Sequence, residues 1–464
     1  MLRGEARLSA ADRGYRRSVD PAALELQVQK VGRELAAALP RGSRGPLRAL
    51  DVRAMEFASQ DVELRAALFR FVDVVPACRS LDELARHLTA FLEAVGEPPP
   101  PISAAMRMGS TRAGRAALGA ASAAGVRRMA HRFIVGQTPR EAGGVLRALW
   151  SDGIAASVDL LGEATVTAGE ADAYAARCHA ALDELTDVYS VLKPRLLLEA
   201  DAAGPTSRVN LSVKISALTP LLRPDAPALG QADAADRLRP LLRRARDLRA
   251  HLHIDMESLD SREAVTGLVL GILSEDEFRD GPSAGLVLQA YLRDSDGLLD
   301  RVLQWAGEAP RTTPLTVRLV KGAYWDHEVV EARQHGWSPP VFEQKADSDR
   351  SFERLTLRLL GARPTVRVAI ASHNLRSVAH AIAAGEALGG GPADVELQVL
   401  RGLGDDLQQA LVSTGRRVRA YCPVGDLVAG MAYLVRRLLE NTSNDSFLHD
   451  QATGVAIEQL LAAP

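Results

Sequence analysis

Apolar residues in the first 150 positions recur every three or four residues, which is the spacing of one face of a helix. The pattern is clearest in ALELQVQKVGRELAAAL (23–39) and LDELARHLTAFLEAV (81–95), and the prolines at 98–101 end the second of these helices. The Ala-rich stretch 102–134 is also helix-prone. No cluster of catalytic side-chain types occurs here, so residues 1–150 are predicted to form a structural helical arm and subdomain.

From about residue 151 the pattern changes to short β-branched runs that alternate with longer helical stretches. The runs are IAASVDLL, RVNLSVKI, LHIDM, GLVLQAYL, LTVRLV, VRVAIAS, VELQVL and RVRAY. Eight strand-like runs, most of them followed by a helix, are typical of an α/β protein with a (β/α)₈ barrel. We therefore predict a TIM-like barrel over residues 151–450 and a short tail over 451–464.

Polar residues interrupt these otherwise apolar runs, nearly always at their carboxyl ends. They are Lys214, Asp255, Gln289, Arg318, Lys321, His373, Asn374, Gln398 and Tyr421. Each has a structural explanation on its own, such as an ion pair for Lys214 or a hydrogen-bonded core position for His373. Arg318 inside a parallel strand is the hardest to explain in this way, because an unpaired buried charge costs several kcal/mol. The carboxyl ends of barrel strands converge on one face, so the set predicts an active site there.

A second polar cluster follows the last strand, in AGMAYLVRRLLENTSNDSFL. Arg436 and Arg437 are adjacent, and Tyr433 and Glu440 lie about one helical turn away on either side. An adjacent arginine pair is most often a solvated surface. Directly after a strand that ends at the pocket, however, two guanidinium groups can hold a substrate carboxylate with bidentate hydrogen bonds.

Composition narrows the class of function. Lys and Arg number 56 and Asp and Glu 58, so the formal net charge of −2 gives no bulk attraction to nucleic acid. The three cysteines, at 78, 178 and 422, form no CxxC pair and are expected to be reduced thiols. No metal-ligand spacing, secretory signal or membrane-length apolar run occurs, which predicts a cytoplasmic protein without a bound metal, and peripheral contact with the inner face of a membrane stays open.

The predicted pocket is rich in cations and amide donors and poor in nucleophiles. Its cations favour anionic partners, either a small carboxylate or a flavin, since positive charge near the flavin N1–C2 oxygen or N5 stabilises the hydride-accepting state. Trp325 and Phe447 can stack on flat rings.

At these residues the chain resembles the proline dehydrogenase family, and in particular the proline dehydrogenase portion of bifunctional proline-utilization flavoenzymes. The matching stretches, in the family order, are SVDLLGEATVT, LSVKISAL, HIDMES, LVLQAYLR, VRLVKGAYWD, PVFEQKADSDRSFERL, ASHN, ELQVLRGLGD, RAYCPVGDL and YLVRRLLENTSNDSF. The stretches RFVDVVPACRSLDELARHL and FIVGQTPREA extend the likeness to about residues 60–450.

The resemblance implies a distorted (β/α)₈ barrel that holds FAD and oxidises L-proline to Δ1-pyrroline-5-carboxylate, the first step of proline catabolism to glutamate. A hydride would pass from proline C5 to flavin N5. A membrane quinone would reoxidise the flavin, and a separate 1-pyrroline-5-carboxylate dehydrogenase is a further expected partner.

The resemblance also assigns roles residue by residue. It implies that the substrate contacts are Glu163, Lys214, Tyr324, Leu400, Tyr421, Tyr433, Arg436 and Arg437. It implies that the FAD contacts are Asp255, Gln289, Arg318, Lys321, Gly322, Tyr324, Trp325, Lys345, His373, Glu440 and Phe447. The groups nearest the reaction would be Lys214, Asp255, Arg318 and Tyr421, and Glu163 would pair with one of the arginines to gate the site.

Two motifs depart from the family pattern. The DAEE-like run reads Asp255-Met256-Glu257-Ser258, and the HGMG-like turn reads Arg401-Gly402-Leu403-Gly404, so that its imidazole is absent. Three other interpretations stay open: a Schiff-base aldolase that uses Lys214 or Lys321, a barrel kept only to bind an aldehyde dehydrogenase, and oxidation of hydroxyproline or another cyclic amino acid.

Overall fold

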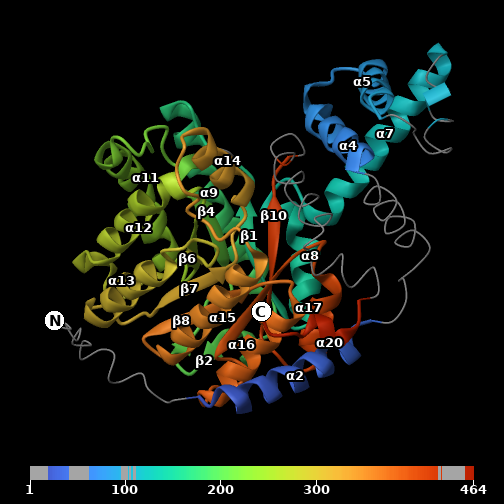
Figure 1. Ribbon diagram of the computed structural model, residues 1–464. Helices are drawn as coiled ribbons and strands as arrows, with labels where there is room; N and C mark the ends of the chain where they lie inside the picture. Colours follow the sequence, from blue (N-terminus) through green and yellow to red (C-terminus); the bar gives the residue numbers. More distant parts are fainter. Residues whose placement is uncertain are drawn as a thin grey trace.

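A closed barrel of parallel strands forms the centre of the molecule (Figure 1). The computed structural model describes residues 19–40, 62–95, 103, 106–107, 111–162, 164–426, 430 and 455–464. The barrel strands are β1 (Ile154–Leu160), β4 (Asn210–Lys214), β5 (His251–Asp255), β6 (Ser283–Gln289), β7 (Leu315–Val320), β8 (Val366–Ala371), β9 (Val395–Leu400) and β10 (Val418–Val424). Each predicted strand-like run falls on one of these strands, which confirms the predicted fold class.

The barrel closes because its last strand pairs with its first. β10 runs parallel to β1 from the pair Ile154 and Val418 to the pair Leu160 and Val424, and β1 also pairs with β4. The other neighbours along the chain pair in sequence order. The eight barrel strands all point the same way, so their carboxyl ends meet at one mouth and their amino ends at the opposite base.

Helices cover the outside of the barrel. They are α9 (Ala168–Ser190), α11 (Pro227–Asp247), α12 (Leu259–Leu273), α13 (Ser295–Glu308), α14 (Trp325–Gln334), α15 (Lys345–Gly361), α16 (Leu375–Ala387) and α17 (Asp405–Ser413), with short 3₁₀ turns η2 (Ile215–Ala217) and η3 (Asp276–Phe278). Local sequence sets where some of them begin. At α9, Thr167 accepts a hydrogen bond from the Glu170 amide, and the Glu170 carboxylate accepts one from the Thr167 amide, which is a capping box.

The helix α2 (Pro21–Ala38) packs on the barrel layer, along α16 (Figure 1). It buries Leu24, Val28 and Leu35, which lie on one helical face. The buried Arg376 of α16 donates to both carboxylate oxygens of Glu25 at 2.9 and 2.8 Å. An apolar stripe and one paired guanidinium therefore hold this helix against the barrel. α8 (Pro139–Ser151) leads into β1, and the short helix α20 (Ile457–Leu460) lies beside α2.

A second group of helices stands away from the barrel (Figure 1). It contains α4 (Val62–Val74), η1 (Val75–Ala77), α5 (Leu81–Glu93) and α7 (Arg112–Phe133). These helices have a hydrophobic core of their own, which reaches the barrel side through Ile134, Leu161 and Leu403. The described N-terminal helices thus belong to two packing groups, one with α2 and one with α4, α5 and α7. The predicted domain boundaries at residues 150 and 450 stay predictions.

A small hairpin, which was not among the strand-like runs predicted from the sequence, lies at the base of the barrel. After α10 (Leu196–Glu199), β2 (Ala200–Asp201) pairs antiparallel with β3 (Gly204–Pro205). Strands of two residues carry no readable alternation, which is why the pattern missed them. Asp201 ties the hairpin to the barrel by ion pairs with Arg367 at 2.9 Å and Arg417 at 3.3 Å.

Candidate active site

A cavity of about 590 Å³ opens at the carboxyl ends of the barrel strands. Every described residue that the sequence analysis assigned to the site lines it: Lys214, Asp255, Gln289, Arg318, Lys321, Gly322, Tyr324, Trp325, Lys345, His373, Leu400 and Tyr421. The structure thus brings together residues from seven strands and their following loops, because the barrel collects all carboxyl strand ends at one mouth.

Other residues predicted for the site lie outside the described residues. They are Glu163, Tyr433, Arg436, Arg437, Glu440 and Phe447. Their roles stay predictions.

Arg318 of β7 is the buried cation at the floor of this cavity, only 4% exposed. Its Nη1 donates to Asp255 Oδ1 at 2.6 Å, and its Nε donates to Gln398 Oε1 at 2.7 Å. The guanidinium carbon lies 5.3 Å from the centroid of the Tyr421 ring, whose hydroxyl donates to Asp255 Oδ2 at 2.6 Å. Asp255 therefore compensates the buried charge and fixes both neighbours, as charge-assisted hydrogen bonds do.

Lys214 is a second cation, at the end of β4. Its Nζ pairs with Asp159 Oδ1 at 2.5 Å and lies 3.9 Å from Asp255 Oδ2. Burial alone would lower the pKa of Lys214, but Asp159 and Asp255 raise it by more, so the net pKa lies above its ordinary value. Lys214 therefore stays protonated and can attract an anion, whereas a Schiff-base nucleophile needs a lowered pKa.

Two lysines that share one aspartate form a third charged cluster, toward the outer side of the cavity. Lys321 follows β7 and pairs with Asp349 of α15, and Lys345 Nζ donates to the other oxygen of Asp349 at 2.8 Å. Burial lowers the pKa of Lys321. Burial would raise the pKa of Asp349, but Lys321 and Lys345 lower it on balance. Two ammonium groups share one carboxylate, so this side of the cavity has a surplus positive charge suited to a phosphate.

The turn between Lys321 and Tyr324 depends on Gly322. Its φ is +136°, and a Cβ at this position would lie 2.3 Å from the Tyr291 ring. Only glycine avoids both the strained conformation and this collision. The close approach fixes where Lys321 and the aromatic residues Tyr324 and Trp325 enter the cavity.

A buried amide oxygen on the cavity wall has no partner among the described residues. Gln289 Nε2 donates to the Glu257 carbonyl at 2.9 Å, which leaves Gln289 Oε1 as an acceptor without a donor. A buried acceptor of this kind is costly unless a ligand N–H or a water completes it. An amide acceptor, a floor guanidinium and an ammonium pair fit the heterocycle and the phosphates of a flavin dinucleotide.

Asp159 and Asp349 hold Lys214 and Lys321 and were not predicted from the sequence. Asp159 lies within the first strand-like run, so the rule that selected Lys214 also applies to it. Asp349 lies on a helix among other charges, and only the folded structure distinguishes it from a surface residue. No group of three or more metal-ligating side chains occurs in the described part of the chain.

Comparison with known families identifies the family to which the chain belongs. A family model described as proline dehydrogenase matches residues 143–450, which is more than half of the chain. The chain belongs to the proline dehydrogenase family. A second model, described as the proline utilization A N-terminal domain, matches residues 25–133. The predicted family is thus confirmed.

The chain matches only part of some relatives and nearly the whole length of others. The bifunctional protein PutA of Escherichia coli (strain K12) is 32% identical over 350 residues, which cover 73% of this chain and 25% of that protein. A proline dehydrogenase of Deinococcus radiodurans is 29% identical over 320 residues, covering 69% of this chain and 88% of the relative. The chain thus spans about a quarter of the length of the bifunctional relatives that it matches.

The solved structures agree with this likeness. Proline utilization A of Bdellovibrio bacteriovorus, in a form inactivated by N-propargylglycine, superposes with a TM-score of 0.86 at 33% identity. The match covers 95% of this chain and 44% of that one.

Proposed function

We propose that this chain is an FAD-dependent proline dehydrogenase, which oxidises L-proline to Δ1-pyrroline-5-carboxylate. The observation that carries the proposal is the group formed by Lys214, Asp255, Arg318 and Tyr421 at the mouth of a proline dehydrogenase family barrel. Lys214 offers positive charge to the carboxylate of the amino acid. Asp255 and Tyr421 form the adjoining wall of the substrate site.

The reaction removes a hydride from C5 of the neutral amine, while the nitrogen lone pair forms the C=N bond. The remaining N–H proton passes to water. When bound, the flavin supplies the electron acceptor for this hydride. The protein binds the ring of proline, orients C5 and excludes water, and such positioning accounts for much of the rate of an enzyme with no covalent nucleophile.

In this proposal the described residues divide between two ligands. Gln289, Arg318 and Trp325 hold the flavin ring, and Lys321 and Lys345 hold its phosphates. Arg436 and Arg437 complete the proline carboxylate site as the family resemblance implies, and the resemblance assigns His373, Glu440 and Phe447 to further FAD contacts. A membrane quinone as electron acceptor and a separate 1-pyrroline-5-carboxylate dehydrogenase belong to the same proposal. In the described part of the chain, no helix combines the length and apolarity needed to cross a bilayer.

The absorbance spectrum of the purified protein tests this function. We expect flavin bands in the visible region, which bleach when L-proline is added without oxygen. D-Proline and hydroxyproline are the matched controls, and bleaching by hydroxyproline at the lower concentration would reassign the substrate. A colourless protein that borohydride and a keto acid modify covalently would instead be a Schiff-base aldolase.

A further inference from the structure

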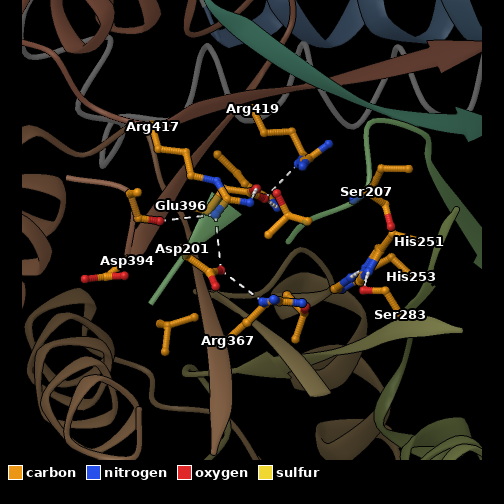
Figure 2. A pocket seen from close by; sticks show the side chains of 16 residues that line it. Asp201, Ser207, His251, His253, Ser283, Arg367, Asp394, Glu396, Arg417 and Arg419 are labelled. Atoms are coloured by element: carbon orange, nitrogen blue, oxygen red, sulfur yellow. Dashed lines mark hydrogen bonds and ion pairs between the residues drawn. The ribbon is translucent and has the colours of Figure 1, made fainter. Parts of the chain in front are cut away.

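The side chain of Gln398, on β9, reaches both ends of the barrel. Gln398 lines the large cavity at the mouth and also a pocket of about 30 Å³ at the base. Figure 2 shows that base pocket, where charged side chains from the amino ends of the strands converge. Gln398 is 4% exposed, so its polar atoms depend on protein partners at both ends.

At the base, Glu396 is held between two arginines (Figure 2). Its Oε1 accepts from Arg419 Nε at 2.8 Å, and its Oε2 accepts from Arg417 Nη2 at 3.0 Å. Burial would raise the pKa of Glu396, but Arg419 and Arg417 lower it to well below its ordinary value. This carboxylate is therefore ionised at neutral pH and then can only accept hydrogen bonds.

An ionised Glu396 fixes which way round the Gln398 amide lies. Gln398 Nε2 donates to Glu396 Oε1 at 2.7 Å, so Gln398 Oε1 must face the other way. There it accepts from Arg318 Nε at 2.7 Å. A reversed amide would place an oxygen against the carboxylate and N–H groups against the guanidinium, and both contacts would be repulsive.

Gln398 and Asp255 together set the plane of the Arg318 guanidinium. Asp255 holds Nη1 at 2.6 Å, and Gln398 holds Nε. Two acceptors at different edges of a planar group restrain both its position and its rotation. Without Gln398, Nε would lose its acceptor, and only Asp255 and two long hydrogen bonds from Nη2 to Ser157 Oγ and Ser212 Oγ, at 3.4 Å each, would restrain the guanidinium.

We propose that Gln398 and Glu396 are positioning residues, which transmit the rigidity of the basal ion cluster to Arg318. The inference rests on the proposed function, in which Arg318 lies beside the flavin. Held in this way, the guanidinium stays where negative charge develops on reduction, and it keeps the reduction potential of the bound flavin high.

The variant Gln398→Met tests this relay, because methionine keeps the length of the side chain and removes both polar ends. We expect kcat with proline to fall about tenfold while KM changes less, as for a misplaced group that acts in the transition state. We also expect a more negative reduction potential, measured by titration of the holoenzyme with a chemical reductant. This titration does not depend on proline turnover.

Arg367→Met is the matched control. Arg367 pairs with Asp201 in the same basal cluster, and none of its hydrogen bonds reaches Gln398, Glu396 or Arg318. We expect this variant to lose stability and to keep the wild-type reduction potential and kcat. An equal change of potential in both variants would overturn the relay, because general loosening of the base would then explain it.

Two further outcomes separate the relay from the function. A wild-type potential and kcat in folded Gln398→Met would overturn the relay and leave the proline dehydrogenase proposal standing. A holoenzyme that L-proline fails to reduce would overturn the function, while the potentials of the variants still judge the relay. If Gln398→Met does not fold, Glu396→Gln takes its place, and we expect a smaller shift of potential in the same direction because the amide can then reverse.

Discussion

At the scale of single residues, the cavity floor is a set of charges that compensate one another. Asp255 accepts hydrogen bonds from Arg318 and Tyr421, and it lies within 4 Å of the Lys214 ammonium group. Removing one partner of a buried pair costs more than the pair is worth, because the other charge stays buried without compensation.

We expect Asp255→Asn to lower the free energy of unfolding by about 3–5 kcal/mol. We expect kcat/KM for proline to fall about 100-fold, since Arg318 loses the group that orients it. Urea unfolding and steady-state kinetics measure the two effects. Asp183→Asn is the control, because Asp183 pairs with Arg244 on the surface and such pairs contribute about 0–1 kcal/mol. Equal losses in both variants would contradict the assigned role of Asp255.

A second prediction concerns the arginine pair that the family resemblance assigns to the carboxylate. We expect Arg437→Met to raise KM for proline about 10- to 100-fold, because a charge-assisted hydrogen bond contributes about 1.5–3 kcal/mol. Bound flavin should be unchanged, as its visible absorbance would show. Arg223→Met, at an exposed arginine, is the control and should leave KM unaltered. A variant that binds proline normally but loses its colour would show that the division of roles is wrong.

At the scale of elements, the connection after β7 forms part of the cavity wall. Gly322 allows the chain to pass against Tyr291 and to place Lys321 opposite α15. The residue type matters here for a steric reason that no hydrophobic pattern records.

We expect Gly322→Ala to weaken flavin binding about tenfold, which corresponds to a loss of only 1.4 kcal/mol. The added Cβ would collide with the Tyr291 ring and displace the turn. Flavin content and the Kd of the apoprotein for FAD measure this effect. Gly336→Ala separates strain from collision, because Gly336 also has a positive φ of +70° but has open space around its Cβ position. Full flavin content in both variants would contradict the prediction.

We expect the stability of the contact between α2 and α16 to depend on pH. His380 of α16 is buried, and it faces Glu353 of α15, Glu25 of α2 and Arg376. Burial, with a contribution from Arg376, lowers the pKa of His380 from 6.5 to about 4. Between pH 6.5 and 4, His380 is protonated in the unfolded chain and neutral in the folded chain. The free energy of unfolding therefore falls as the pH falls through this window.

We expect wild-type protein to lose about 3 kcal/mol of unfolding free energy through this group between pH 6.5 and 4, at 1.36 kcal/mol for each pKa unit. His380→Gln should lack that part of the pH slope. Urea unfolding at several pH values compares the two proteins, and the other buried histidines contribute equally to both. An identical slope would show that His380 does not titrate in this way.

At the scale of the whole molecule, the barrel separates two polar ends. The mouth holds a large cavity in which Gln289 Oε1 has no partner among the described residues, and the base holds a smaller pocket beside ion pairs of Glu396 and Asp201. In the proposed function the ligands bind at the mouth, where residues of seven strands meet, so we expect their binding to stabilise the whole barrel.

We expect excess FAD to raise the unfolding free energy of the apoprotein by about 2.7 kcal/mol at 100 times its Kd, since only the folded barrel binds it. FMN lacks the adenylate half and should stabilise less at the same concentration. Thermal unfolding with each ligand measures this difference. Equal stabilisation by FMN would contradict FAD as the cofactor.

Sequence alone determined the eight strand runs, the mouth at which they end and the polar residues collected there. These follow from local rules, because burial on both faces selects apolar strands and makes Arg318 or Lys214 conspicuous. The resemblance of the motifs to a known family added the chemistry that we expect of this set.

The partners of these residues are visible only in the folded protein. Asp159 pairs with Lys214 and Asp349 pairs with Lys321, and each aspartate lies on a different strand or helix from its lysine. Glu396 accepts from Gln398 at the base of the barrel, away from the predicted site. The strand pattern also overlooked the base, where His251, Arg417 and Arg419 lie at the amino ends of strands. A pairwise contact between distant residues depends on strand register and helix packing, and neither leaves a period in the sequence.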